Sequence, residues 1–190
     1  MVIGPMVMYR MVAQQTSLPP ETEALFKQVA GEFVHGLFPS FRMPAFLACP
    51  DDACTRAVLA AIAQAATTKG VDMEVVDLSP APAERLASVT ARLCGFHRQS
   101  CGEDAPAVRV LALDGFDLLE GEDNDAPIYP FRSQFQFDED YRWLFLGRNW
   151  QRLRRLFGSY RLPLYHAASD LTPEPWRISS RASPPARWAR

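Results

Sequence analysis

The chain has 190 residues, of which 48% are hydrophobic and 22% charged, and its formal net charge is −2. This length and composition fit one ordinary domain with its own core, and they exclude a disordered or fibrous chain. A membrane-spanning helix needs about 20 consecutive apolar residues, whereas the longest apolar run, residues 57–63, has seven. The four cysteines are too few for a disulfide scaffold. We therefore expect a cytoplasmic protein with reduced cysteines and no membrane contact.

Helical and strand-like periodicities alternate along the first part of the chain. Leu25, Val29, Phe33 and Leu37 recur at four-residue spacing, which is typical of an amphipathic helix. Prolines and glycines separate the segments that follow. The predicted elements are a helix over residues 21–36, a strand over 45–48, a helix over 53–66, a strand over 73–78, a helix over 84–93 and an apolar strand over 108–113.

The second part of the chain continues the alternation and then changes composition. The predicted elements are a surface loop over residues 121–130, a strand over 143–146, a helix over 149–157 and an extended Arg/Pro-rich tail over 173–190. Strands that alternate with helices, with apolar central strands, indicate an α/β fold with a parallel sheet of about five strands and helices on both faces. We expect an N-terminal extension over residues 1–18 and a core over 19–172.

Charge is distributed unevenly along the chain. Residues 142–190 contain ten arginines and two acidic residues, a net charge of +8, so residues 1–141 carry −10. Arginines mixed with aromatic side chains are favoured at both protein and nucleic-acid interfaces. We expect a protein partner at this face, with nucleic acid as the alternative. The predicted interaction residues are Arg148, Arg152, Arg154, Arg155, Arg161, Trp150 and Trp188.

Three segments, in this order, resemble the nucleotide-binding core of the P-loop ATPases, in particular the AAA-like branch with its origin-recognition and signalling ATPases. Residues 48–55, ACPDDACT, lie where the family has its phosphate loop, and residues 108–119, VRVLALDGFDLL, are similar to its apolar strand ending in aspartate. Residues 143–165, WLFLGRNWQRLRRLFGSYRLPLY, are similar to its fourth strand and the following helix. The resemblance spans roughly residues 20–175 and implies a three-layer P-loop NTPase-like fold.

The phosphate-loop segment departs from the family at the positions that carry its chemistry. In a phosphate loop, glycines let backbone N–H groups surround the phosphates, a lysine contacts the outer phosphates and a hydroxyl holds magnesium. Here Ala48 and Ala53 stand at the glycine positions and Cys54 at the lysine position, and only Thr55 is retained. The resemblance therefore implies that these residues are remnants of a nucleotide site.

Acidic residues alter the site further. Asp51 and Asp52 lie within the segment, and each would repel a phosphate charge by about 4 kcal/mol at 4 Å and an effective dielectric constant of 20. Asp114 can still hold magnesium, but Gly115 replaces the glutamate that the family uses to position water. We therefore expect a pseudo-ATPase without catalysis or cofactor, acting as a scaffold or regulatory subunit beside an active ATPase or in a larger complex. The expected vestigial nucleotide-binding residues are Ala48, Ala53, Cys54, Thr55 and Asp114.

The cysteines and remaining acidic residues leave other hypotheses open. Cys54 lies near a predicted helix start, so a small cysteine-dependent enzyme is a further alternative. A zinc site would require Cys49 and Cys54 to meet Cys94, His97 and Cys101, and inert buried cysteines are the favoured interpretation. His166 is expected in a loop or an interface. A solvated acidic loop, rather than a cation site, is predicted for Asp114, Asp117, Glu120, Glu122, Asp123 and Asp125.

Overall fold

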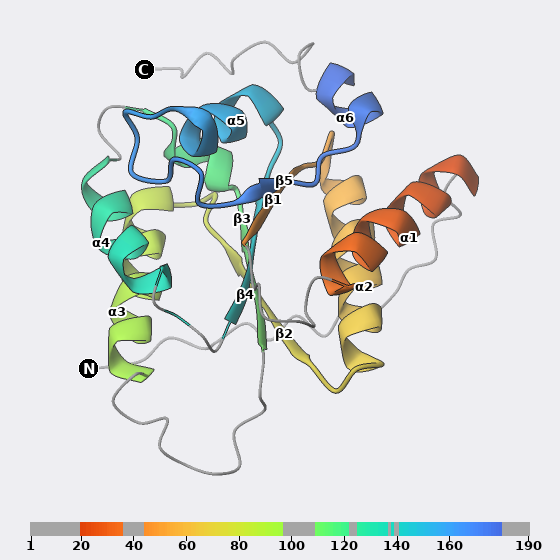
Figure 1. The fold of residues 1–190 in the computed structure, drawn as a ribbon, viewed down its shortest axis with the longest axis horizontal. Coiled ribbons are helices and arrows are strands. Elements are labelled where there is room, and N and C mark those ends of the chain that lie inside the picture. Colours follow the sequence, from red (N-terminus) through yellow and green to blue (C-terminus); the bar gives the residue numbers. More distant parts are fainter. Residues whose placement is uncertain are drawn as a thin grey trace.

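The computed structural model describes residues 20–35, 44–96, 109–121, 125–136, 138 and 141–179. A central sheet lies between two layers of helices (Figure 1). Its elements are α1 (Pro20–His35), β1 (Ala45–Ala48), α2 (Asp52–Thr67), β2 (Asp72–Asp77), α3 (Pro82–Phe96), β3 (Arg109–Asp114), η1 (Phe116–Leu119), α4 (Asp125–Phe135), β4 (Tyr141–Gly147), α5 (Trp150–Gly158), β5 (Ser169–Asp170) and α6 (Glu174–Ser179).

The five strands run in the order β2-β3-β4-β1-β5, and every neighbouring pair is parallel. Helices α1 and α2 cover one face of the sheet, while α3, α4 and α5 cover the other (Figure 1). The predicted parallel five-strand α/β fold is therefore confirmed. Because all strands point the same way, their carboxyl ends, and the turns that follow them, meet at one edge of the sheet.

Strand β4 shows why the central strands lack polar alternation. Every residue of β4 is buried. Trp143 and Phe145 pack into the core under α3, α4 and α5, while Leu144 and Leu146 pack into the core under α1 and α2. Successive side chains of a strand point to opposite faces, so a strand covered on both sides is mostly apolar. Arg142, near the start of β4, is the buried charged exception.

Helix α4 occupies much of the segment that the sequence predicts as a surface loop, so that prediction was wrong for residues 125–130. Prolines and acidic residues there suggested a loop, and Pro130 lies inside the helix. Ile128, Phe131 and Phe135 nevertheless recur at helical spacing and are all buried in the core. Burying three large side chains contributes several kcal/mol, at about 1.5–3 kcal/mol each, which offsets the hydrogen bond lost at the proline.

The C-terminal part also differs from the predicted extended tail. Helix α6 lies within it, and Trp176 is buried with its ring centroid 5.6 Å from that of Phe26 in α1. The packed core therefore continues past residue 172, to Trp176. Residues 1–18 and 180–190, which complete the predicted extension and tail, lie outside the described residues. Within the described part of the chain, no helix is both long and apolar enough to cross a membrane.

Candidate functional site

The connection between β1 and α2 is much shorter than a phosphate loop. β1 ends at Ala48 and α2 begins at Asp52, so residues 49–51 alone join them. The Cys49 N–H donates to the carbonyl of Gly147 at 2.9 Å, and Pro50 has no N–H to offer. Ala53, at the second predicted glycine position, already lies in the first turn of α2. Few backbone N–H groups in this connection are left to surround a phosphate.

The start of α2 is capped by the chain's own carboxylate. Asp51 Oδ1 accepts a hydrogen bond from the Cys54 N–H at 2.7 Å. The Thr55 hydroxyl, which would hold magnesium in the family, instead donates to the Asp51 carbonyl at 3.0 Å and is almost fully buried. A helix N-terminus favours an anion because its first N–H groups lack partners. Here Asp51 is that anion.

Arg148 lies directly after β4 and reaches the predicted site residue Asp114 and also Asp52, in the phosphate-loop segment. Its Nη1 and Nη2 donate to Asp114 Oδ1 and Oδ2 at 2.9 and 3.2 Å, and its Nε donates to Asp52 Oδ1 at 2.9 Å. The residues converge because β3 and β4 are neighbouring parallel strands and α2 starts after β1, on the other side of β4. One guanidinium therefore bridges the end of β3 and the start of α2.

The electrostatics of this bridge keep Arg148 charged. Burial lowers the pKa of Arg148, but the hydrogen bonds and negative charges of Asp114 and Asp52 outweigh burial, so its pKa is raised. Arg148 is predicted from sequence to lie on the interaction face, whereas two-thirds of its side chain is covered in the structure. Its cation lies on Asp114, the residue that the resemblance assigns to magnesium.

Gly115, at the position of the family's glutamate, has a backbone that favours glycine. Its φ is +80°, and a Cβ atom there would lie 3.2 Å from both the backbone nitrogen and the Oγ of Ser79. Residues that carry a side chain rarely adopt this left-handed backbone conformation. A glutamate at this position would therefore be both strained and crowded in the present turn.

Asp117 is a buried residue of the site. Its predicted place in a solvated acidic loop was wrong. Only 3% of it is exposed. Its Oδ2 accepts the N–H of Asn149 at 3.0 Å, and its Oδ1 has no hydrogen-bond partner within the described residues. A Cβ on Gly147 would lie 2.4 Å from that Oδ1. Asp117 thus holds the turn that carries Arg148.

The environment of Asp117 also affects its ionisation. Burial raises the pKa of the Asp117 carboxyl, against the opposing effect of the N–H groups and charge of the turn around Arg148 and Asn149. The sequence signal that could have indicated burial of Asp117 is its position between two apolar residues, Phe116 and Leu118. Glu120 is not a solvated acid either, because it pairs with two arginines of α5.

Cys49 and Cys54 lie in an environment that disfavours a reactive thiolate at Cys54. Cys49 and Cys54 are buried free thiols. The hydrogen bond that the Cys54 thiol shares with Cys49, burial and nearby negative charge raise the pKa of Cys54, and a protonated thiol is a poor nucleophile. Cys94 is exposed on α3, while His97 and Cys101 lie outside the described residues. No group of three or more potential metal ligands forms among the residues that the structure describes.

The predicted interaction residues around α5 fall into several environments. Arg152 and Arg155 pair with Glu120 at 3.5 and 3.1 Å, whereas Arg154 lies over the ring of buried Trp150 at 5.1 Å. The Trp150 Nε1 donates to Asp170 at 3.0 Å.

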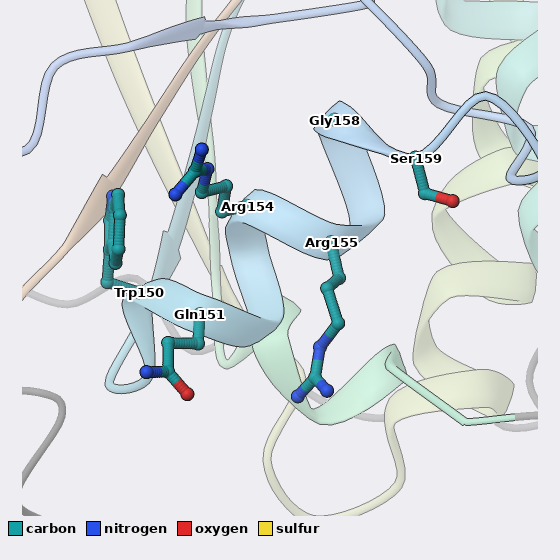
Figure 2. A pocket seen from close by; sticks show the side chains of 6 residues that line it. All are labelled: Trp150, Gln151, Arg154, Arg155, Gly158 and Ser159. Carbon is teal, nitrogen blue, oxygen red and sulfur yellow. The ribbon is translucent and has the colours of Figure 1, made fainter.

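Beyond α5, exposed Arg161 stacks on exposed Tyr160. His166 is exposed in the loop that follows, as expected, and Trp188 lies outside the described residues. A surface cavity of about 540 Å³ is lined by Trp150, Gln151, Arg154, Arg155, Gly158 and Ser159 (Figure 2).

Comparisons with known proteins bear on the fold. No family model and no curated protein matches the sequence. The ORC1 protein of Aeropyrum pernix, solved in complex with DNA, aligns with a TM-score of 0.54 and 13% identity over 82% of this chain and 45% of its own. The Walker-type ATPase PABY2304 of Pyrococcus abyssi aligns with a TM-score of 0.47 and 11% identity over 77% and 51% of the two chains.

The replication initiator DnaA, bound to AMPPCP and single-stranded DNA, aligns with a TM-score of 0.45 and 16% identity over 76% of this chain and 44% of its own. The chain thus spans about half the length of the structures that it resembles. The similarity to ORC1 confirms the predicted fold, a parallel α/β sheet with helices on both faces.

Proposed function

We propose that this chain is a pseudo-ATPase, which neither binds nor hydrolyses nucleoside triphosphates and acts as a scaffold or regulatory subunit for a protein partner. The observation that carries the proposal is the contact of Arg148 with Asp114 and Asp52. On an ATPase-like fold, this contact places an internal cation on the aspartate that would otherwise hold magnesium.

Two further features oppose nucleotide binding. The Asp51 carboxylate caps the helix start where a phosphate would be received, and a phosphate there would meet a like charge. Buried Cys54 stands at the position of the phosphate-clamping lysine and carries no positive charge. A nucleotide would have to displace Arg148, and hydrogen bonds between charged groups contribute about 1.5–3 kcal/mol each.

A scaffold role is supported by the internal partners of three aspartates at the start of α2 and the end of β3. The carboxylates of Asp51, Asp52 and Asp114 each have a partner in the chain. These three carboxylates need no bound cation, which is consistent with a domain that acts through its surface. The arginines and aromatic side chains of α5 and the loop after it are the part of that surface we assign to a partner.

Nucleotide titration of the full chain tests the proposal. Thermal unfolding and isothermal calorimetry would be measured with Mg-ATP, Mg-ADP and Mg-AMPPCP up to 1 mM, together with phosphate release. A ligand with a dissociation constant of about 10 µM would stabilise the fold by about 2.7 kcal/mol at 1 mM, which is a readily measured shift in melting temperature. We expect no shift and no phosphate release, and saturable micromolar binding would overturn the proposal.

Nucleic-acid binding by the same face is the alternative function. It is favoured by the arginine excess of residues 142–190 and by the DNA in the ORC1 complex. Electrostatic DNA binding weakens steeply as salt is raised, with a slope that follows the number of phosphates contacted. Binding to duplex or single-stranded DNA at 50 mM salt that is lost at 200 mM and in Arg154→Glu would favour this alternative over a protein partner.

A further inference from the structure

We propose that the outer face of α5 is a docking groove for an acidic peptide segment of the protein partner. The groove is the cavity of about 540 Å³ lined by Trp150, Gln151, Arg154, Arg155, Gly158 and Ser159 (Figure 2). This inference rests on the proposed function, because it assigns a chemistry to the partner of the scaffold. The observation that supports this inference is the charge complementarity between the arginines of the groove and the carboxylates of an acidic peptide.

Arg154 is the central cation of the groove and is held ready for a ligand. It is exposed, and its guanidinium carbon lies 5.1 Å from the centroid of the Trp150 ring. That ring is itself fixed, since Trp150 is buried and its Nε1 donates to Asp170 at 3.0 Å. No carboxylate pairs with Arg154 within the part of the chain that the structure describes. A stacked guanidinium keeps its in-plane donors available for a carboxylate, and its fixed position reduces the entropy lost on binding.

Arg155 is a second cation with unused donors. Its side chain is 60% exposed, and its Nε lies 3.1 Å from Glu120 Oε1. Glu120 is shared, because its other oxygen pairs with Arg152 at 3.5 Å. One carboxylate between two guanidinium groups leaves a net positive charge at this position. A second carboxylate can therefore bind Arg155 without displacing Glu120.

The arrangement of the two arginines selects an extended ligand. Arg154 and Arg155 leave α5 in different directions, toward Trp150 and toward the opposite side of the helix (Figure 2). A single phosphate or carboxylate cannot bridge guanidinium groups that diverge, whereas a peptide that crosses the helix can contact both in turn. Gln151 and Ser159 line the same groove and offer neutral hydrogen bonds to peptide groups between the charges.

The acidic residues that border the arginines favour a peptide over a nucleic acid. Glu120 lies at one side of α5, while Asp170 and Glu174 pair with Arg177 beside Trp150. A phosphate backbone carries a charge on every unit and would meet these carboxylates. An acidic peptide with uncharged residues between its carboxylates can place its charges on Arg154 and Arg155 alone.

Fluorescence anisotropy with the full chain tests the inference. The probe is a fluorescein-labelled peptide with four Glu-Ala-Leu repeats, and its control is the matching Gln-Ala-Leu peptide. We expect the glutamate peptide to bind and the glutamine peptide to bind at least tenfold more weakly. Arg154→Gln and Arg155→Gln should each weaken binding about tenfold, and Arg154→Lys should give an intermediate loss because lysine keeps the charge but loses the planar fork. Arg56→Gln on α2, exposed on the opposite layer, should have no effect.

Equal binding of the two peptides, no binding of the glutamate peptide up to 1 mM, or full binding by the Arg154→Gln/Arg155→Gln double variant would overturn the inference. Tighter binding of single-stranded DNA than of the glutamate peptide would assign the face to nucleic acid and would also overturn it. Circular dichroism of each variant shows that the fold is intact. The nucleotide titration is read independently, so exclusion of ATP together with failure of the peptide would reject the groove and leave the pseudo-ATPase proposal standing.

Discussion

The guanidinium of Arg148 makes a two-pronged contact with the carboxylate of Asp114, with Nη1 2.9 Å from Oδ1 and Nη2 3.2 Å from Oδ2. Asp114 ends β3 and Arg148 follows β4, so the contact joins the carboxyl ends of two adjacent strands. In an open α/β sheet this edge is where ligands are bound. Here an intramolecular ion pair occupies it, and its consequences for stability and ion binding can be measured.

Replacing Arg148 by methionine should lower the free energy of unfolding by about 2 kcal/mol, because mostly buried Asp114 loses its charged partner. The matched control is Asp52→Asn, which removes the other partner of the same guanidinium. The Asp52 side chain is 77% exposed, so this change should cost under about 0.5 kcal/mol. Urea unfolding at pH 7 measures both. Equal losses in the two variants would mean that Asp114 is not the main partner.

Removing the guanidinium should also uncover a weak cation site. In Arg148→Ala the carboxylates of Asp114 and Asp52 lack their cation, and magnesium prefers carboxylate oxygens. We expect MgCl₂ to raise the melting temperature of Arg148→Ala and to leave the wild type unchanged. At ten times the dissociation constant, the gain is about 1.4 kcal/mol. Potassium chloride at matched ionic strength is the control, and an equal response of variant and wild type to both salts would contradict the prediction.

The sheet could be predicted from sequence more fully than the site. Strand β1 is bounded by Pro44 and Pro50, and the apolar runs of β3 and β4 indicate burial on both faces, so local sequence locates these strands. Arg148 was grouped with the neighbouring arginines of α5 because spacing along the chain cannot show that it meets Asp114. That meeting depends on the register of β4 against β3, in which Leu113 pairs with Phe145.

Helix α4 and the burial of Asp117 were also not predicted from sequence, because both depend on tertiary packing. Pro130 and nearby acids favour a loop locally, and the core contacts of Phe131 and Phe135 override that preference. Asp117 carries a charged side chain, which is rarely buried, and nothing in its immediate sequence shows that a glycine 30 residues further along the chain makes room for it. Both depend on contacts between segments distant in sequence.

Asp117→Asn should change how stability depends on pH. Burial raises the folded-state pKa of Asp117 above its ordinary value of 3.8. The contribution of this carboxyl to the free energy of unfolding is therefore fully present below that ordinary value and is lost as pH rises through the folded-state pKa. Asparagine does not titrate. The variant should gain stability relative to the wild type between pH 3 and pH 7, as measured by urea unfolding at each pH. A relative loss over that range would show that the ionised carboxylate stabilises the fold.

Gly147→Ala should destabilise the protein through a contact with Asp117. The added Cβ would lie 2.4 Å from Asp117 Oδ1 and 2.7 Å from its Cγ, and such overpacking costs about 1–3 kcal/mol. In an Asp117→Ala background the Oδ1 and Cγ atoms are gone, and only the Cβ of residue 117, at 2.8 Å, remains close to the added atom. The same glycine substitution should therefore cost at least about 1 kcal/mol less in that background than in the wild type.

A double-mutant cycle measured by urea unfolding isolates this contact, and we expect a coupling of at least about 1 kcal/mol. Gly31→Ala is the control for the substitution itself. Gly31 lies in α1 and nothing is within 4 Å of the position its Cβ would occupy, so alanine should stabilise the helix by about 0.5–1 kcal/mol. Additive effects of Gly147→Ala and Asp117→Ala would show that the two residues do not interact energetically. Strong coupling would instead mean that Gly147 is required because Asp117 fills the space beside it, in the turn that directs Arg148 onto Asp114.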